Sequence, residues 1–145
     1  MQHGQAKTEE EDPERPLTDH GVDDVTRVAT HAVDTLGVRS PRVVHSGKTR
    51  ARQTAEIWGG LLGARVEQAD ALAPDDDPTT WVERIVTATD DIVLVGHLPH
   101  LSRLAARLLT GDSDHPVVRF RPGGLVELEP ADADSGWVVS LVLPP

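Results

Sequence analysis

Two histidines and one arginine of this sequence have neighbours that make phosphoryl chemistry possible. His3 stands in a Gln-His-Gly turn at the start of the chain, His97 in a Gly-His-Leu-Pro sequence, and Arg50 in the basic segment 46–54. A neutral imidazole can attack phosphorus. A guanidinium and the amide groups of a helix N-terminus can bind the phosphoryl oxygens. We therefore expect a phosphate-binding site if the fold brings the three side chains together.

Strands and helices alternate along most of the chain, and these elements must position the three side chains. Apolar or β-branched runs predict strands at 42–46, 64–68, 92–95, 117–121, 125–129 and 137–143. Apolar spacing of three and four residues predicts helices at 18–36, 81–88 and 99–109, and one that ends at Leu62. The run 92–95 is expected to be buried on both faces. The alternation favours a three-layer α/β/α sandwich with a mostly parallel central sheet, in which sites form at the carboxyl ends of strands.

Composition narrows the class of protein further. The 145 residues suit a single domain, 1–145, and the net charge of −10 argues against nucleic acid or an anionic membrane as a partner. No apolar run reaches membrane-spanning length, and the first residues are polar, so a cytoplasmic location is the expectation. The absence of cysteine excludes disulfides and thiolate chemistry.

Less specific interpretations of the same residues stay open. His97 and His100 have the i, i+3 spacing of a metal pair, but no third ligand stands at a recognisable spacing, so neither a metal nor a cofactor is expected. Lys48 and Arg52 fit a solvated first turn of a helix, although cations there oppose the helix dipole. The acidic run 75–77 is either a solvated loop or the source of a proton donor.

As a set, the motifs resemble the histidine phosphatase superfamily, whose fold is phosphoglycerate mutase-like. The matching segments are Gln2-His3-Gly4, Arg15-Pro16-Leu17-Thr18 with Gly21, Ser46 with Arg50-Ala51 and Gln53-Thr54-Ala55, and Gly96-His97-Leu98-Pro99. They stand in the family's order and spacing from residue 2 to about residue 128. The short length and the Gly-His-x-Pro form are most similar to the SixA-type phosphohistidine phosphatases.

The resemblance assigns roles to five residues. It implies that His3 is the nucleophile that becomes phosphorylated, that Arg50 binds the phosphoryl oxygens, and that His97 completes the pocket and stabilises the transition state. Gly4 and Ser46 would shape the two turns around the phosphate.

The chain departs from the family pattern in two places. Gln2 stands where the family has arginine, and an amide cannot neutralise phosphate or form the guanidinium fork. Lys48 or Arg52 is a candidate to replace that charge. Family members also have a strand before this turn, so either the chain has further residues upstream of Met1, which we favour, or the sheet is built without that strand.

Three functions follow from these observations. The first is a metal-independent phosphohistidine phosphatase that acts on a phosphoprotein through a phospho-His3 intermediate. It is favoured because the chain has no room for the helical insertions of sugar-phosphate relatives, and because a protonated imidazole is a good leaving group. The alternatives are a small-molecule phosphomonoesterase with an acid from 75–77, and a phospho-ligand binding module without turnover.

Overall fold

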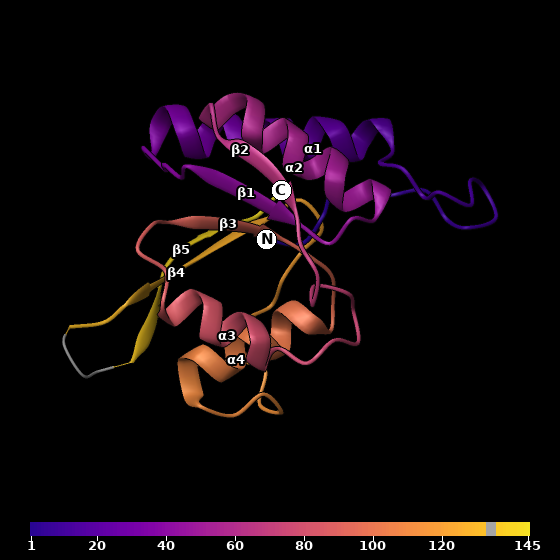
Figure 1. The fold of residues 1–145 in the computed structure, drawn as a ribbon. Helices are drawn as coiled ribbons and strands as arrows, with labels where there is room; N and C mark the ends of the chain where they lie inside the picture. The colour runs from indigo at the N-terminus through magenta and orange to yellow at the C-terminus, as the bar shows by residue number, and fades with distance from the viewer. Residues whose placement is uncertain (133–135) are drawn as a thin grey trace.

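The fold has three layers, with helices on both faces of a central sheet. The computed structural model describes residues 1–132 and 136–145. In chain order its elements are α1 (Asp19–Thr30), a π-helical turn η1 (His31–Thr35), β1 (Arg42–His45), α2 (Thr49–Leu62), β2 (Arg65–Gln68), α3 (Thr79–Val86), β3 (Ile92–Val95), α4 (His100–Thr110), β4 (Leu125–Pro130) and β5 (Trp137–Leu143). Helices α1 and α2 cover one face of the sheet, and α3 and α4 cover the other (Figure 1). The expected α/β/α sandwich is confirmed.

The sheet consists of two parts that meet at the first residues of the chain. Strands β2, β1 and β3 are parallel in that order, whereas β4 and β5 form an antiparallel pair. Gln2 links the two parts, because it forms isolated bridges with Gly96 after β3 and with Pro122 before β4. The sheet is therefore mostly parallel, as the alternation of elements predicts.

Alternating side chains of the strands build a core on each face of the sheet. Val43 packs with Val25 and Trp58 of α1 and α2, while its neighbour Val44 packs with Trp81 and Leu104 of α3 and α4. Successive side chains of a strand point to opposite faces, so one short strand serves both clusters. Within the described ranges, none of the helices is long and apolar enough to cross a membrane.

Local signals in the sequence place the helix ends well. The hydroxyl of Thr18 accepts a hydrogen bond from the N–H of Gly21 and caps α1. Gly63 and Gly111 end α2 and α4 in the left-handed conformation, with φ of 64° and 79°. These helices begin and end within a few residues of the predicted positions.

Two expectations about strands are wrong. Residues 117–121 run in an irregular conformation, and Val117 is 57% exposed, because this segment pairs with the sheet only through Pro122. Strand β3 is not buried on both faces, since Ile92 and Leu94 are only half-buried. Both side chains border a cavity at this position.

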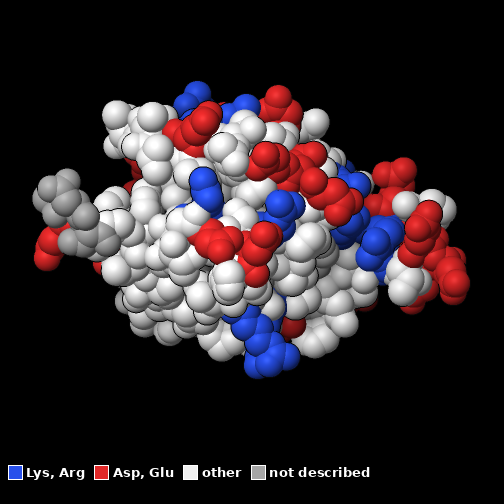
Figure 2. Space-filling model, turned by 90° about the horizontal axis from the view of Figure 1, so that it is seen from below, with Lys and Arg blue, Asp and Glu red and all other residues white. Residues whose placement is uncertain are grey.

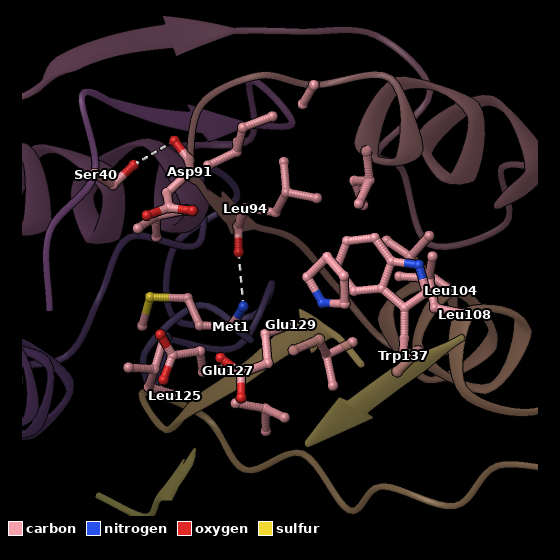
Figure 3. A pocket seen from close by; sticks show the side chains of 18 of the residues that line it. Met1, Ser40, Asp91, Leu94, Leu104, Leu108, Leu125, Glu127, Glu129 and Trp137 are labelled. Atoms are coloured by element: carbon pink, nitrogen blue, oxygen red, sulfur yellow. Dashed lines mark hydrogen bonds between the residues drawn. The ribbon is translucent and has the colours of Figure 1, made fainter. Parts of the chain in front are cut away.

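That cavity separates the two parts of the sheet. It has a volume of ≈ 420 Å³ and is lined by residues of β3 and β4 and by Met1, Leu104 and Trp137 (Figure 3). The amino group of Met1 donates to the carbonyl oxygen of Leu94 at 2.7 Å, and burial lowers its pKa to about 5. Met1 and Gln2 thus lie between β3 and the segment that leads into β4.

Candidate active site

The site lies where β1 and β3 end next to the first residues of the chain. His45 and Val95 are paired in register, so the segments that follow them, at Ser46 and at Gly96 and His97, leave the sheet side by side. Backbone hydrogen bonds run from the N–H of His3 to the oxygen of Gly96 at 3.2 Å, and from the N–H of Gly96 to the oxygen of Met1 at 3.1 Å. Three segments that are distant in sequence therefore meet at one edge.

The structure brings His3, Arg50 and His97 together, as the sequence predicts. The ring centroids of His3 and His97 are 4.9 Å apart. The Nε–H of Arg50 donates to Nε2 of His3 at 3.1 Å. On the other side, Ser46 Oγ and His97 Nε2 form a hydrogen bond of 2.6 Å. Arg50 comes from the first turn of α2, Ser46 follows β1 and His97 follows β3, so three elements position this cluster.

The hydrogen bonds of His3 define which ring nitrogen is free to react. Nδ1 lies 2.7 Å from the carbonyl oxygen of Gly4, which can only accept, so the proton belongs on Nδ1. Nε2 then carries the lone pair and accepts from Arg50. This tautomer places the lone pair of an imidazole nitrogen in direct contact with a guanidinium, a group that can bind phosphate.

Both histidines are held in the neutral form. The pKa of His3 is lowered to about 4, chiefly by burial, with smaller contributions from the positive charges of Arg50 and Arg15 that act against the opposing hydrogen bond to Gly4. Burial likewise lowers the pKa of His97 to about 3, with contributions from His3, Arg50 and Lys48. An uncharged imidazole is the nucleophilic form, so at neutral pH the lone pair of His3 is available.

Two helix N-termini contribute polar groups to the same region. Helix α2 begins after Lys48 and α4 after Pro99, and no side chain of the described ranges caps either helix. Uncapped N–H groups and the positive end of the helix dipole favour an anion. The combination of the helix ends with Arg50 fits the oxygens of a phosphoryl group.

Close packing fixes the turn that carries His3. The N–H of Gly4 donates to Oγ1 of Thr54 at 3.0 Å, and Thr54 in turn donates to the carbonyl oxygen of Arg50 at 2.8 Å. A Cβ at Gly4 would lie 2.7 Å from Cγ2 of Val25, and a Cβ at Gly21 would lie 2.1 Å from the oxygen of Gln5. Neither position can accept a side chain without movement of the turn.

The remaining residues predicted from the sequence are placed less favourably for chemistry. Asp76 Oδ2 accepts from the N–H of Ala73, and Asp77 Oδ1 from that of Thr79, so both carboxylates stabilise a turn. His100 is fully buried, and neither of its ring nitrogens has a partner in the described chain. Within residues 1–132 and 136–145, no group of three or more histidine and acidic side chains is placed to hold a metal ion.

The cations near Gln2 differ from those expected. The half-buried side chain of Gln2 has an oxygen that is buried and has no partner among the described residues. Arg52 is not directed to the site, because its guanidinium pairs with Glu56 at 2.9 Å. Arg15, to which the sequence analysis assigned no role, adds a positive charge that acts on both His3 and Arg50. The sequence signal for Arg15 is its place in the Arg15-Pro16-Leu17-Thr18 segment, which the resemblance includes without giving the arginine a role.

Comparisons with known proteins show which proteins the sequence and the fold resemble. No family model matches the sequence. An uncharacterized protein of Picosynechococcus sp. is 33% identical over 123 residues, which cover 81% of this chain and 73% of that protein. The structure of the protein histidine phosphatase SixA complexed with tungstate is 26% identical, with a TM-score of 0.83 over 99% of this chain and 94% of SixA.

Other members of the same fold act on small molecules. The alpha-ribazole phosphatase from Shigella flexneri matches 100% of this chain and 94% of its own chain with a TM-score of 0.73, at 17% identity. The fold and the order of the motifs agree, and this chain belongs to the histidine phosphatase superfamily. The structures that it matches include SixA-type members of the superfamily.

Proposed function

We propose that this protein is a phosphohistidine phosphatase that acts on a phosphoprotein through a phosphorylated His3. The observation that carries the proposal is the contact between Nε2 of His3 and the Nε–H of Arg50 at 3.1 Å, in a pocket that keeps the imidazole neutral. The lone pair and the phosphate-binding group therefore lie side by side before a substrate arrives. Arg50 needs only to turn toward the phosphoryl oxygens to free the lone pair.

The reaction has two displacements at phosphorus. In the first, the lone pair of His3 Nε2 forms a bond to phosphorus while the P–N bond to the substrate imidazole breaks. That electron pair stays on the substrate ring, which leaves as neutral imidazole when it enters protonated. In the second, water attacks phosphorus, the bond to Nε2 breaks, the electron pair returns to His3 and the water proton passes to solvent or phosphate. Arg50 and the α2 amides stabilise the charge on the equatorial oxygens in both steps.

The charges around the two histidines favour a P–N bond over a phosphomonoester. Apart from His3 and His97 themselves, the side chains that shift the pKa of either ring in the described chain are Arg15, Lys48, Arg50 and His100, and none of them is a carboxyl group. An alkoxide leaving group needs a proton donor, whereas a protonated imidazole does not. Asp76 and Asp77 already bind backbone N–H groups, so neither is free to fill this role.

Rapid quench with a ³²P-labelled phosphohistidine peptide tests the proposal. We expect a phosphoenzyme that is labile in acid and stable in base, as a phosphoramidate is, and that is absent from His3→Ala. His31→Asn, a change of an exposed histidine, serves as the matched control and retains the signal. Activity should survive EDTA, since the proposed steps use cationic side chains. Loss on chelation, restored by a divalent cation, would contradict this mechanism.

Two other functions predict different results in the same assay. A small-molecule phosphomonoesterase, for which the alpha-ribazole phosphatase is a structural precedent, would turn over p-nitrophenyl phosphate faster than the peptide. A binding module, which the neutral Gln2 suggests, would bind the phosphohistidine peptide without forming a phosphoenzyme. We expect the peptide to be the better substrate.

A further inference from the structure

The loop that follows His3 is a hairpin attached to the phosphate-binding helix. Ala6 pairs with Leu17 in an antiparallel bridge, the N–H of Lys7 donates to the oxygen of Pro16 at 2.9 Å, and the N–H of Thr18 donates to the oxygen of Gln5 at 3.0 Å. The hairpin therefore leaves the site at Gly4 and returns beside it. In Figure 2 it lies at the projecting right-hand end of the molecule, where acidic side chains are outermost and basic ones lie inside them.

Two contacts hold the returning arm of the hairpin against the first turns of α2. Glu14 Oε2 accepts from the hydroxyl of Thr49 at 3.2 Å, and the N–H of Leu17 donates to Oε1 of Gln53 at 2.8 Å. Thr49 and Gln53 flank Arg50 on the helix. Arg15 stands between the two attached residues in the sequence, so the hairpin holds it next to Arg50.

The conformation of Arg15 is unusual for a residue with a side chain. Its φ is 49°, in the left-handed region, and its N–H donates to the oxygen of Asp12 at 2.9 Å. The Nε–H donates to the oxygen of Lys7 at 3.2 Å, which leaves the outer nitrogens of the guanidinium for another partner. No carboxylate of the described ranges forms an ion pair with it, although five of the six residues from Glu9 to Glu14 are acidic.

The cations of the site act differently on its two histidines. Arg50 lowers the pKa of both rings, Arg15 acts on His3 and on Arg50, and Lys48 acts on His97. The contacts of the hairpin with α2 therefore hold Arg15 close enough to His3 and Arg50 for its charge to act on them. Lys48 is exposed, and Arg52 is engaged by Glu56.

We propose that Arg15 binds the phosphoryl oxygens beside His3 and supplies the positive charge that Gln2 does not carry. The inference rests on the proposed function only in that it takes the His3 pocket as the phosphoryl site. It explains how a chain with a neutral residue before the nucleophile retains a cationic pocket. A guanidinium that has two free nitrogens can bind two phosphoryl oxygens at once.

Calorimetric titration with orthovanadate tests this assignment without requiring turnover. We expect Arg15→Ala to weaken vanadate binding about tenfold or more, the scale of one charge-assisted contact, and Arg15→Gln to weaken it similarly although it retains a hydrogen-bond donor. Arg52→Ala removes a cation of α2 that pairs with Glu56 and is expected to bind as wild type does. Thermal unfolding of each variant shows whether the hairpin is intact.

A second substitution distinguishes an electrostatic role of Arg15 from a structural one. Gln2→Arg should restore most of the affinity to Arg15→Ala, and should add little to the wild-type chain, in which Arg15 already serves. Wild-type affinity in Arg15→Gln, or failure of the rescue in a variant that unfolds at the wild-type temperature, would overturn the assignment. Vanadate binding that depends on Arg15 in a protein that forms no phosphoenzyme would leave the assignment standing and refute the proposed function. Absence of vanadate binding by wild type would refute both.

Discussion

The Nε–H of Arg50 points at Nε2 of His3, so the guanidinium lies directly in front of the lone pair of that nitrogen. The 3.1 Å contact holds the imidazole in one tautomer together with the Gly4 carbonyl. Arg50 is half-buried, and desolvation with the neighbouring charge of Arg15 lowers its pKa. An anion that enters the pocket therefore relieves repulsion between two guanidinium groups, and this favours phosphate binding.

Replacement of Arg50 should remove most of the activity. We expect Arg50→Ala to lower kcat/KM on a phosphohistidine peptide by roughly 10²–10³, as loss of one preorganised oxyanion donor does. Arg52→Ala, two residues along the same helix and paired with Glu56, is the matched control and should retain wild-type kinetics. Steady-state assays of the two purified variants make the comparison. Equal losses in both variants would show that the general charge of α2, and not the contact with His3, matters.

The lowered pKa of His3 should extend activity to acid pH. A histidine with an ordinary pKa of about 6.5 would lose roughly tenfold of its neutral form between pH 7.5 and 5.5. Because the pKa of His3 is held at about 4, the phosphorylation rate should change less than twofold over this range. Single-turnover assays with p-nitrophenyl phosphate, which tolerates acid, measure the rate, and NMR titration of the His3 ring gives its pKa independently. A tenfold fall that follows an NMR midpoint near 6.5 would contradict the expectation.

The same buried groups should make the fold less stable in acid. Met1, His3 and His97 have folded-state pKa values of about 5, 4 and 3, below the ordinary values of 8.0 and 6.5. As pH falls, the unfolded chain binds these protons first, so stability is full above pH 8 and is lost progressively from pH 8 toward pH 3. Each pKa unit contributes at most about 1.4 kcal/mol to the free energy of unfolding. Urea unfolding at pH 8, 6.5 and 5 should show this fall, and His97→Asn should reduce it, whereas the surface variant His31→Asn should not.

The sequence predicted most of the fold because its signals were local. Thr18, Gly63 and Gly111 act through hydrogen bonds and backbone angles within one turn of a helix, and these interactions depend little on the rest of the chain. The strand predicted at 117–121 does not form, because a β-branched run becomes a strand only where a neighbouring strand pairs with it. The same reason applies to Leu94, whose exposure depends on a cavity between distant segments.

The site was predictable to the extent that its residues follow strands. His97 and Arg50 belong to segments that leave neighbouring strands, so the parallel topology alone brings them to one edge. No role was predicted for Arg15, although its segment is part of the resemblance, because its position depends on a left-handed backbone angle and on two contacts with α2. Neither produces a periodic pattern in the sequence.

The contact between Gly21 and the hairpin should be essential for the site. A Cβ at Gly21 would meet the oxygen of Gln5 at 2.1 Å, so Gly21→Ala must displace the arm that follows His3. We expect a loss of about 1–3 kcal/mol in the free energy of unfolding, together with a fall in kcat/KM. Gly60→Ala is the matched control, because its Cβ would meet nothing within 4 Å in the last turn of α2, and it should stabilise the protein by about 0.5–1 kcal/mol. Similar effects of the two substitutions in urea unfolding would contradict this account.

Filling the cavity between β3 and β4 should stabilise the protein strongly. The edge of β3 that faces away from β1 pairs with no strand of the described ranges, and the half-buried Leu94 borders a space of ≈ 420 Å³ that Met1 also lines. Gln2 forms a parallel bridge with Gly96, so residues added before Met1 would lie beside β3 and run in the same direction as that strand. A variant with an added Val-Leu-Val-Leu tetrapeptide before Met1 would replace the ammonium by an amide, fill the cavity and pair with the strand edge.

We expect this extension to raise the free energy of unfolding by several kcal/mol, on the scale of about 2–5 kcal/mol for one large core side chain. It should also flatten the fall of stability between pH 8 and pH 5, because Met1 no longer titrates. A Gly-Ser-Gly-Ser extension is the control, since it removes the buried charge but supplies no apolar side chains. The control should flatten the pH dependence of the free energy of unfolding, but it should lack the stabilisation that the apolar side chains provide. Equal stability of the two extended chains at pH 8, where the ammonium contributes least, would show that the cavity itself does not limit the fold.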